Sequence, residues 1–440
     1  MPLPLTDADT LFEQLLPDLP PETIPLAREF KAFARAKKVK TPEQLLRLVL
    51  LYCGLDKPLR EVAGTFTVLY ESITDQSVAD RLRACGPWIK ATLRHMLPLS
   101  AVSALPQGLR FLVIDASTVQ APGAKGTDHR LHIAMDLVSL EFIEVLISDV
   151  HTGETLKHFT LAPGDVAVAD RGYAQVQGMS DALKRGAALI VRLNPFSVVV
   201  KDARAQPLSL RDALKRQKTE TIRPVEVRLQ SSDGQDEVHG WVHAYRLSAE
   251  QAGRARQQCR KRHKTGTPKA QTLYLAGWVL VFTTLAPACL SPSTIMALYR
   301  CRWQVELAIK RWKSVLDVDA LRAKANSPLA EVWLHGKLLY AVLLERRMQR
   351  HLGKRGDRLD QERVVTRWRV WGLLKDEIAP MITGSLFWKD EAWEVCLKVL
   401  AERPRRRKLQ QLPPEAIAVL YRYDESPPEE MSIEKMPIAA

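Results

Sequence analysis

Residues 111–115 read FLVID, four apolar residues followed by a carboxylate, and this stretch decides the fold. A second stretch of the same form, VAVAD, occupies residues 166–170. Short apolar runs rich in β-branched residues, separated by turns that contain Gly and Asp, are typical of buried strands. Similar runs at 132–135, 142–147 and 189–191 give hairpin-type strands followed by strand, helix and strand. This pattern predicts a mixed α/β sheet.

The sequence on either side of these strands has a different pattern. Residues 1 to about 100 show the Leu-rich periodicity of helices, and Thr41-Pro42 is typical of a helix start, because Thr caps and Pro is tolerated at the first position. A later helix is expected to be capped by Asp75 or Ser77. Further strands are predicted at 224–229, 240–247 and 278–283, and the chain from about 291 reads as helical.

The charge balance points to a polyanionic partner. The 440 residues include 64 Lys and Arg against 50 Asp and Glu, a net charge of +14. A protein this basic usually binds nucleic acid or an anionic membrane surface. The alternative is a basic protein that has no polyanionic partner.

Membrane and secretion are disfavoured. The longest nearly apolar run, 277–290, is 14 residues long and contains Pro287, whereas a spanning helix needs about 20. The N-terminus has no signal-peptide pattern. The six cysteines are scattered without a C-x-x-C pair, which argues against a disulfide framework or a structural zinc site. We therefore expect a cytoplasmic protein.

Two acidic residues follow fully apolar strands. Asp115 follows the strand 111–114 and Asp170 the strand 166–169. A carboxylate is costly to bury near the centre of a sheet unless a cation neutralises it, so the pair suggests a shared divalent metal such as Mg²⁺. The alternative, that each Asp merely caps the turn that follows it, remains open at this point.

A third group of polar residues has helical spacing. Tyr299, Arg302, Glu306, Lys310 and Lys313 are spaced 3, 4, 4 and 3 apart, which predicts that they share one face of a single α-helix. A solvated face with i,i+4 ion pairs is the alternative. The neighbouring stripe expected to pack this helix on the sheet is Val305, Ile309, Trp312 and Leu316.

These residues carry a resemblance to a known family. The pattern Tyr299-x-x-Arg302-x-x-x-Glu306-x-x-x-x-x-x-Lys313 resembles the YREK signature of DDE transposases of the insertion-sequence-four family, which includes the transposon-five transposase. The stretches VIDAS at 113–117 and ADRGY at 169–173 resemble that family's first and second aspartate motifs. The order Asp, Asp, Glu and the long insertion before the last acid also agree, and the resemblance runs from about residue 25 to 350.

The resemblance implies an RNase H-like mixed-sheet catalytic core with a β-rich insertion, flanked by N- and C-terminal helical regions. In that reading Asp115, Asp170 and Glu306 are catalytic and bind two Mg²⁺ (or Mn²⁺) ions. The implied reaction is cut-and-paste transposition: metal-dependent cleavage at terminal inverted repeats, then transfer of the 3′-OH to target DNA. The implied partner is double-stranded DNA, bound by a homodimer without a membrane, in a prokaryotic cytoplasm at the nucleoid.

Further residues are expected to contact DNA. Trp278 is expected to stack on a base flipped out of the duplex, with a hairpin intermediate on the transposon end, although ordinary strand core is an equal alternative. The full set of expected DNA contacts is Tyr299, Arg302, Lys310, Lys313, Trp278 and Arg171. The basic run 254–269 is expected to be a flexible loop that tracks phosphates or a disordered surface loop.

The expected domains follow from these motifs. They are a helical DNA-binding domain (1–105), the first part of the core (106–195), a β-rich insertion (196–272), the second part of the core (273–330), and a C-terminal helical region and tail (331–440) that is a candidate for dimerisation. Two rival functions are open: a domesticated DDE-type nuclease that cuts without joining, and a transposon-derived DNA-binding protein with an inactive site.

Overall fold

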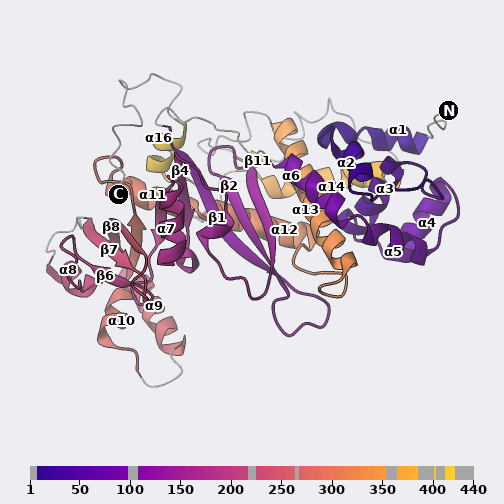
Figure 1. Cartoon of the computed structure of the whole chain (residues 1–440). Coiled ribbons are helices and arrows are strands. Elements are labelled where there is room, and N and C mark those ends of the chain that lie inside the picture. The colour runs from indigo at the N-terminus through magenta and orange to yellow at the C-terminus, as the bar shows by residue number, and fades with distance from the viewer. Residues whose placement is uncertain are drawn as a thin grey trace.

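The computed structural model describes residues 7–97, 108–216, 224–262, 267–352, 364–384, 401–402 and 412–421. Nine strands form one sheet in the order β3-β2-β1-β4-β5-β9-β8-β7-β6 (Figure 1). β4 is parallel to both β1 and β5, and the other neighbouring strands of this sheet are antiparallel. The prediction of a mixed α/β, RNase H-like core with flanking helices is therefore confirmed. The strands are β1 (Arg110–Val119), β2 (His129–Asp136), β3 (Phe142–Asp149), β4 (Asp165–Ala169), β5 (Ala188–Arg192), β6 (Val199–Lys201), β7 (Val225–Gln230), β8 (Glu237–Arg246) and β9 (Trp278–Thr283).

The strands of the insertion join the core sheet directly. β9 pairs with β5 on one side and with β8 on the other, and β7 and β6 continue outward from β8. Figure 1 shows the insertion at the end of the sheet remote from the N-terminal helices. The insertion is thus an extension of the core sheet, hydrogen-bonded to it strand by strand.

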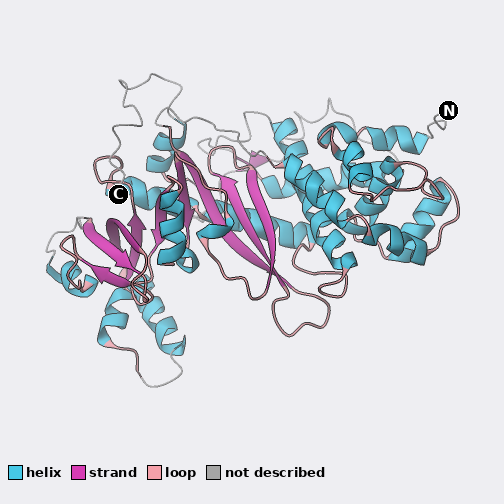
Figure 2. Ribbon diagram, in the orientation of Figure 1, coloured by secondary structure: helices cyan, strands magenta, loops and turns pink. Residues whose placement is uncertain are grey.

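Helices cover the core sheet on two faces (Figure 2). Side chains of β1 alternate between the faces: Phe111 and Val113 pack in the same apolar cluster as Trp312, whereas Leu112 and Ile114 pack in the cluster that contains Met179. The helices of the core and insertion are η3 (Leu156–His158), η4 (Arg171–Tyr173), α7 (Val176–Lys184), α8 (Leu210–Arg216), α9 (Ala249–Arg262), α10 (Ala270–Leu275), α11 (Pro292–Cys301) and α12 (Trp303–Leu316).

The N-terminal region is helical as predicted. Thr41 caps α3 by accepting a hydrogen bond from Gln44 N at 3.2 Å, which confirms the predicted helix start. The cap of α5 is Thr74, and neither Asp75 nor Ser77 serves, because Thr74 alone has the extended backbone that a capping residue needs. The elements are α1 (Asp7–Glu13), η1 (Leu16–Asp18), α2 (Thr23–Glu29), α3 (Pro42–Val49), η2 (Leu50–Gly54), α4 (Leu59–Leu69), α5 (Asp75–Arg83) and α6 (Gly86–Met96).

The long helix α13 (Pro328–Leu352) packs against both earlier and later helices of the chain. It packs against α6 and η2 of the N-terminal region and against α14 (Arg367–Thr383). Leu338, Leu339 and Tyr340 are fully buried there, so core packing accounts for the apolar residues of this helix. Farther on, α16 (Pro414–Tyr421) packs on α11, and β10 (Val364–Val365) pairs with β11 (Ala401–Glu402).

The basic run 254–269 is not the loop that we predicted. Its first part lies in α9, whose sequence is rich in Ala, Gln and Arg, all strong helix formers. Residues 263–266 lie outside the described residues.

No helix within the described ranges combines the length and the apolar character that crossing a membrane requires.

Candidate active site

Asp115 and Asp170 lie on neighbouring parallel strands. Ile114 of β1 pairs with Ala169 of β4, so the two aspartates occupy the next position on each strand. We predicted that Asp115 ends its strand, and this is wrong. β1 continues to Val119, because this segment keeps its pairing with β2 after β4 has ended. The two carboxylates therefore meet at the edge where the parallel pairing stops.

The turn-capping alternative holds for one of the two. Asp170 Oδ1 accepts a hydrogen bond from Gly172 N at 2.7 Å and so caps η4. Asp115 Oδ1 accepts only from the next residue, Ala116 N, at 2.9 Å, within a continuing strand. The cap uses Oδ1 of Asp170 and does not use Oδ2, so capping and metal binding by this carboxylate are compatible.

Glu306 reaches this edge from α12, but the predicted single helix is wrong. The chain turns at Arg302, which ends α11 and precedes α12. Arg302 N bonds to Tyr299 O at 3.2 Å, an i to i+3 contact tighter than that of an α-helix, at the point where α11 gives way to α12. Tyr299 consequently lies buried in α11, while Glu306 lies on α12. The predicted packing stripe is confirmed: Val305, Ile309, Trp312 and Leu316 are all buried.

Arg302 holds two of the three acids together. Its Nη1 lies 3.6 Å from Asp115 Oδ2, and its Nη2 is hydrogen-bonded to Glu306 Oε1. Its guanidinium lies over the ring of Tyr299, 6.0 Å from the centroid. One cation therefore serves both Asp115 and Glu306.

The site carries more negative charge than Arg302 balances. Burial, together with the neighbouring charges of Asp170 and Glu306, raises the pKa of Asp115 to about 6, against the opposing effects of Ala116 N–H and Arg302. Asp170 is in no ion pair with any other described residue. Desolvation and like charges both disfavour the charged form of a carboxylate, and both act on Asp115 here.

The donor chemistry suits a divalent metal, and the present side-chain positions suit Arg302. Mg²⁺ prefers a few carboxylate oxygens, which Asp115, Asp170 and Glu306 supply. Within the described ranges, however, no three His, Cys, Asp or Glu side chains are gathered closely enough to hold a metal ion. Arg302 contacts both Asp115 and Glu306, so its guanidinium must move before they can share a metal.

Comparison with known proteins places the chain in a family. Residues 106–342 match the family described as Transposase DDE domain. The chain belongs to this family. The prediction of a DDE transposase, an enzyme that acts on DNA, is thereby confirmed. DDE transposases generally use divalent metals, in keeping with the donor chemistry of the three acids.

Several transposases of insertion sequences are similar to this one. The putative transposase InsL for insertion sequence element IS186A of Escherichia coli (strain K12) is 29% identical over 337 residues, which cover 74% of this chain and 90% of that protein. The transposase for insertion sequence element IS421 of Escherichia coli is 29% identical over 338 residues, with the same coverage. The transposase for insertion sequence element IS231F of Bacillus thuringiensis subsp. israelensis is 26% identical over 204 residues, 42% of each chain.

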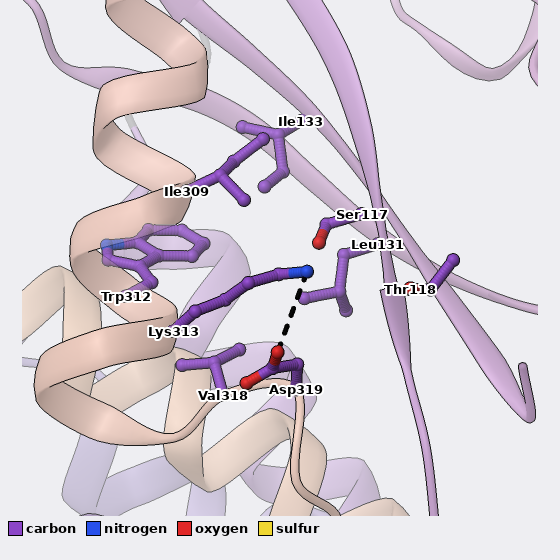
Figure 3. Close-up of a pocket in the computed structure, with 9 residues that line it drawn as sticks. All are labelled: Ser117, Thr118, Leu131, Ile133, Ile309, Trp312, Lys313, Val318 and Asp319. Atoms are coloured by element: carbon purple, nitrogen blue, oxygen red, sulfur yellow. Dashed lines mark ion pairs between the residues drawn. The ribbon is translucent and has the colours of Figure 1, made fainter.

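Two lysines lie farther along α12: Lys313, which ends the YREK-like pattern, and Lys310, which was predicted to share its face. Lys313 points toward the strands and forms an ion pair with Asp319 at 3.6 Å (Figure 3). It lines a small pocket together with Ser117, which follows Asp115 by two positions on β1 and so lies on the same face. Lys310 is exposed, with its ammonium 4.0 Å from the ring centroid of Trp303.

Trp278 and Arg171 lie at the same edge of the transposase sheet. β9 is antiparallel to β5, so Trp278, at its start, lies beyond the carboxyl end of β5. Trp278 is half-buried, with the Arg246 guanidinium 5.9 Å from its ring centroid, an arrangement compatible with both predicted roles. Desolvation and the nearby charges of Arg192 and Arg262 lower the pKa of Arg171.

The sequence analysis did not assign Arg192 or Arg262 to the site, although Arg262 lies in the basic run 254–269. Both lie close enough to Arg171 to affect its pKa. Arg192 ends the apolar strand β5 much as Asp170 follows β4, and that placement was a usable signal. Arg262 ends α9, and only the fold brings it near Arg171.

Proposed function

We propose that this DDE transposase mobilises an insertion sequence by cut-and-paste transposition. It would cleave DNA at terminal inverted repeats and join the resulting 3′-OH to target DNA. The observation that carries the proposal is that Asp115, Asp170 and Glu306 lie at one edge of a mixed sheet, where Arg302 is the one ion-pair partner that the described residues give them. The names of the similar proteins, transposases for insertion sequence elements, support the substrate.

Asp115, Asp170 and Glu306 are the proposed catalytic residues and metal ligands. When bound, two Mg²⁺ or Mn²⁺ ions would activate the attacking oxygen and stabilise the leaving one. The protein's part is to supply carboxylates on two strands and one helix, whose backbones fix the separation between them. Burial of Asp115 supports this assignment, because it keeps competing water scarce around the carboxylate.

Arg302 is the proposed link between DNA binding and metal binding. Its guanidinium pairs with Asp115 and Glu306 in the protein alone, and a DNA phosphate is a competing partner of matching geometry. Moving to a phosphate would free both carboxylates for metal. Tyr299 is buried beneath Arg302, so its proposed role is to orient this guanidinium.

The remaining proposed DNA contacts surround the acids. Lys313 lies along the face that continues from Asp115, and Lys310 extends from the exposed side of α12. Arg171 adds positive charge beside Asp170, and Trp278 is the proposed stacking platform for a flipped base. We also propose that the transposase acts as a dimer on two DNA ends, in the cytoplasm of its host, at the nucleoid.

A strand-transfer assay tests the proposed function. Pre-cleaved ends carrying a 3′-OH, made from the DNA that flanks the gene, are mixed with target plasmid, Mg²⁺ and the full chain. The expected result is a joined product that Asp170→Ala abolishes. Cleavage of intact ends without any joined product would instead identify a nuclease. Retention of binding with neither reaction would identify an inactive DNA-binding protein.

A further inference from the structure

A fourth carboxylate, Glu154, lies beside Asp170. Glu154 belongs to the segment that follows β3, and its side chain is half-buried. A Cβ placed on Gly172 would lie 2.0 Å from Glu154 Oε2 and 3.2 Å from Asp170 Oδ1. The two carboxylates therefore approach the same point on the chain, and Glu154 reaches it only because residue 172 has no side chain.

Arg171 adds positive charge beside Asp170, but neither Asp170 nor Glu154 forms an ion pair with another described residue. Burial and then the charge of Asp170 raise the pKa of Glu154, and Arg130 acts in the opposite direction. Arg130 itself donates from Nη1 to Thr152 O at 2.9 Å. Two carboxylates this close repel each other unless a proton or a further cation is shared between them.

A buried hydroxyl with no partner points to the same place. Tyr173 is 0% exposed, and in the described part of the chain its Oη has no hydrogen-bond partner. Burial, followed by the charges of Glu154, Asp115 and Asp170, raises its pKa, so these carboxylates are its electrostatic neighbours. Buried hydroxyls are nearly always hydrogen-bonded, and this one is able to donate to a carboxylate that lies beside it.

We propose that Glu154 is a fourth metal ligand of the active site, sharing one divalent cation with Asp170, and that the hydroxyl of Tyr173 orients these carboxylates. This inference rests on the proposed function and deepens it. It adds a ligand from outside the Asp, Asp, Glu motif, supplied by the segment between β3 and η3. It also assigns Gly172 the role of keeping the path between the two carboxylates open.

Mn²⁺ binding to the full chain tests the proposal without relying on catalysis. Free Mn²⁺ is counted by electron paramagnetic resonance during a titration, and the melting temperature is measured with and without metal. Glu154→Gln is expected to weaken the binding of one Mn²⁺ by about tenfold or more, and Tyr173→Phe by less. Without metal, Glu154→Gln should melt at the same temperature as the wild type or higher, because a like-charge repulsion is removed. The matched control is Asp149→Asn, which makes the same change of charge on an exposed residue at the end of β3.

The outcomes separate this proposal from the proposed function. Wild-type Mn²⁺ binding by Glu154→Gln overturns the role of Glu154 and leaves the catalytic assignment standing. A lower melting temperature of metal-free Glu154→Gln also overturns it, since that result identifies a structural partner of Arg130. Mn²⁺ binding that is unaffected by Asp170→Ala contradicts the catalytic set itself. A wild type that binds no Mn²⁺ at millimolar concentration overturns the proposal as well. Glu154→Asp, which keeps the charge but shortens the reach, should bind between the wild type and Glu154→Gln.

Discussion

Charged side chains are buried in two regions of this molecule, and the two regions balance them differently. In the helical region, Arg347 of α13 bonds to Asp18 at 2.6 Å and to Glu377 at 2.9 Å, with all three nearly inaccessible to solvent. At the proposed catalytic edge, Asp115 and Glu306 share Arg302, and Asp170 has no ion-pair partner within the described part of the chain. Buried charge that is matched holds helices together, whereas buried charge left in excess requires a cation from outside.

A second buried group confirms that the helical region is balanced. Lys337 of α13 is fully buried and pairs with Asp56, which also pairs with Arg322 at 3.3 Å. Burial lowers the pKa of Lys337, and Asp56 works against this effect. These pairs connect the N-terminal helices to α13 and to the segment after α12. In this region, where no ligand is expected, the buried Lys337 and Arg347 each have acidic partners within the chain.

The largest effect is expected from removing one of the unmatched acids. Asp170→Ala should reduce DNA cleavage by on the order of 10³-fold or more, because several kcal/mol of metal-mediated stabilisation are lost. End binding in a gel-shift assay should persist, since the basic residues are untouched. Cleavage near the wild-type rate would show that the excess charge at this edge is not catalytic.

Breaking the matched network should affect folding and not chemistry. Arg347→Ala leaves Asp18 and Glu377 buried without their shared cation, and the free energy of unfolding should fall by about 3–5 kcal/mol. Urea denaturation measures this loss. Arg350→Ala is the control: Arg350 also pairs with Asp18 but is 53% exposed, so its removal should cost about 1 kcal/mol or less. Equal losses in the two variants would contradict the comparison.

Neutralising Asp115 should have the opposite sign. Because its pKa is raised to about 6 from an ordinary value of 3.8, its contribution to stability is present below pH 4 and is lost as the pH rises through 6. Metal-free Asp115→Asn should therefore be more stable than the wild type at pH 7.5, by about 1–3 kcal/mol. The gain should shrink as the pH falls toward 4. Asp319→Asn, at a more exposed carboxylate, is the control variant measured over the same pH range.

The smallest effect is expected at Lys313. Lys313→Ala should weaken binding to end DNA by about 1 kcal/mol and reduce the slope of log affinity against log salt by about one phosphate contact. Asp319→Asn releases Lys313 from its ion pair and should tighten binding slightly. Titrations at several salt concentrations measure both, and an unchanged slope for Lys313→Ala would remove this residue from the DNA surface.

The strands of the core were predictable because a strand that is buried on both faces has a nearly continuous run of apolar residues in its own sequence. The apolar runs that became β1, β4 and β5 are visible without any knowledge of their partners. The extension of β1 to Val119 was not visible, since its later residues are mixed and their place in the strand comes from pairing with β2. The helix α9 was not predicted because a run of cations with little apolar periodicity is typical of a solvated loop, although its Ala, Gln and Arg residues favour a helix.

The candidate site was predictable only where its residues share an element or a strand end. Helical spacing identified Glu306 and Lys313, but the turn at Arg302 depends on how α11 and α12 pack on the sheet. The pairing of Lys313 with Asp319 requires the chain to reverse after α12, which Asp317 achieves with a φ of 51°. Glu154 lies between elements, so only the fold brings it to Asp170.

The continuous sheet of Figure 1 has a consequence for where DNA is cut. Because β8 and β9 are hydrogen-bonded to the core through β5, the basic helix α9, which follows β8, stands at a fixed offset from Asp115. A DNA end held at α9 would present the same phosphate to the acids each time. Inserting residues between β8 and α9 should therefore spread the position of the cut before it weakens binding.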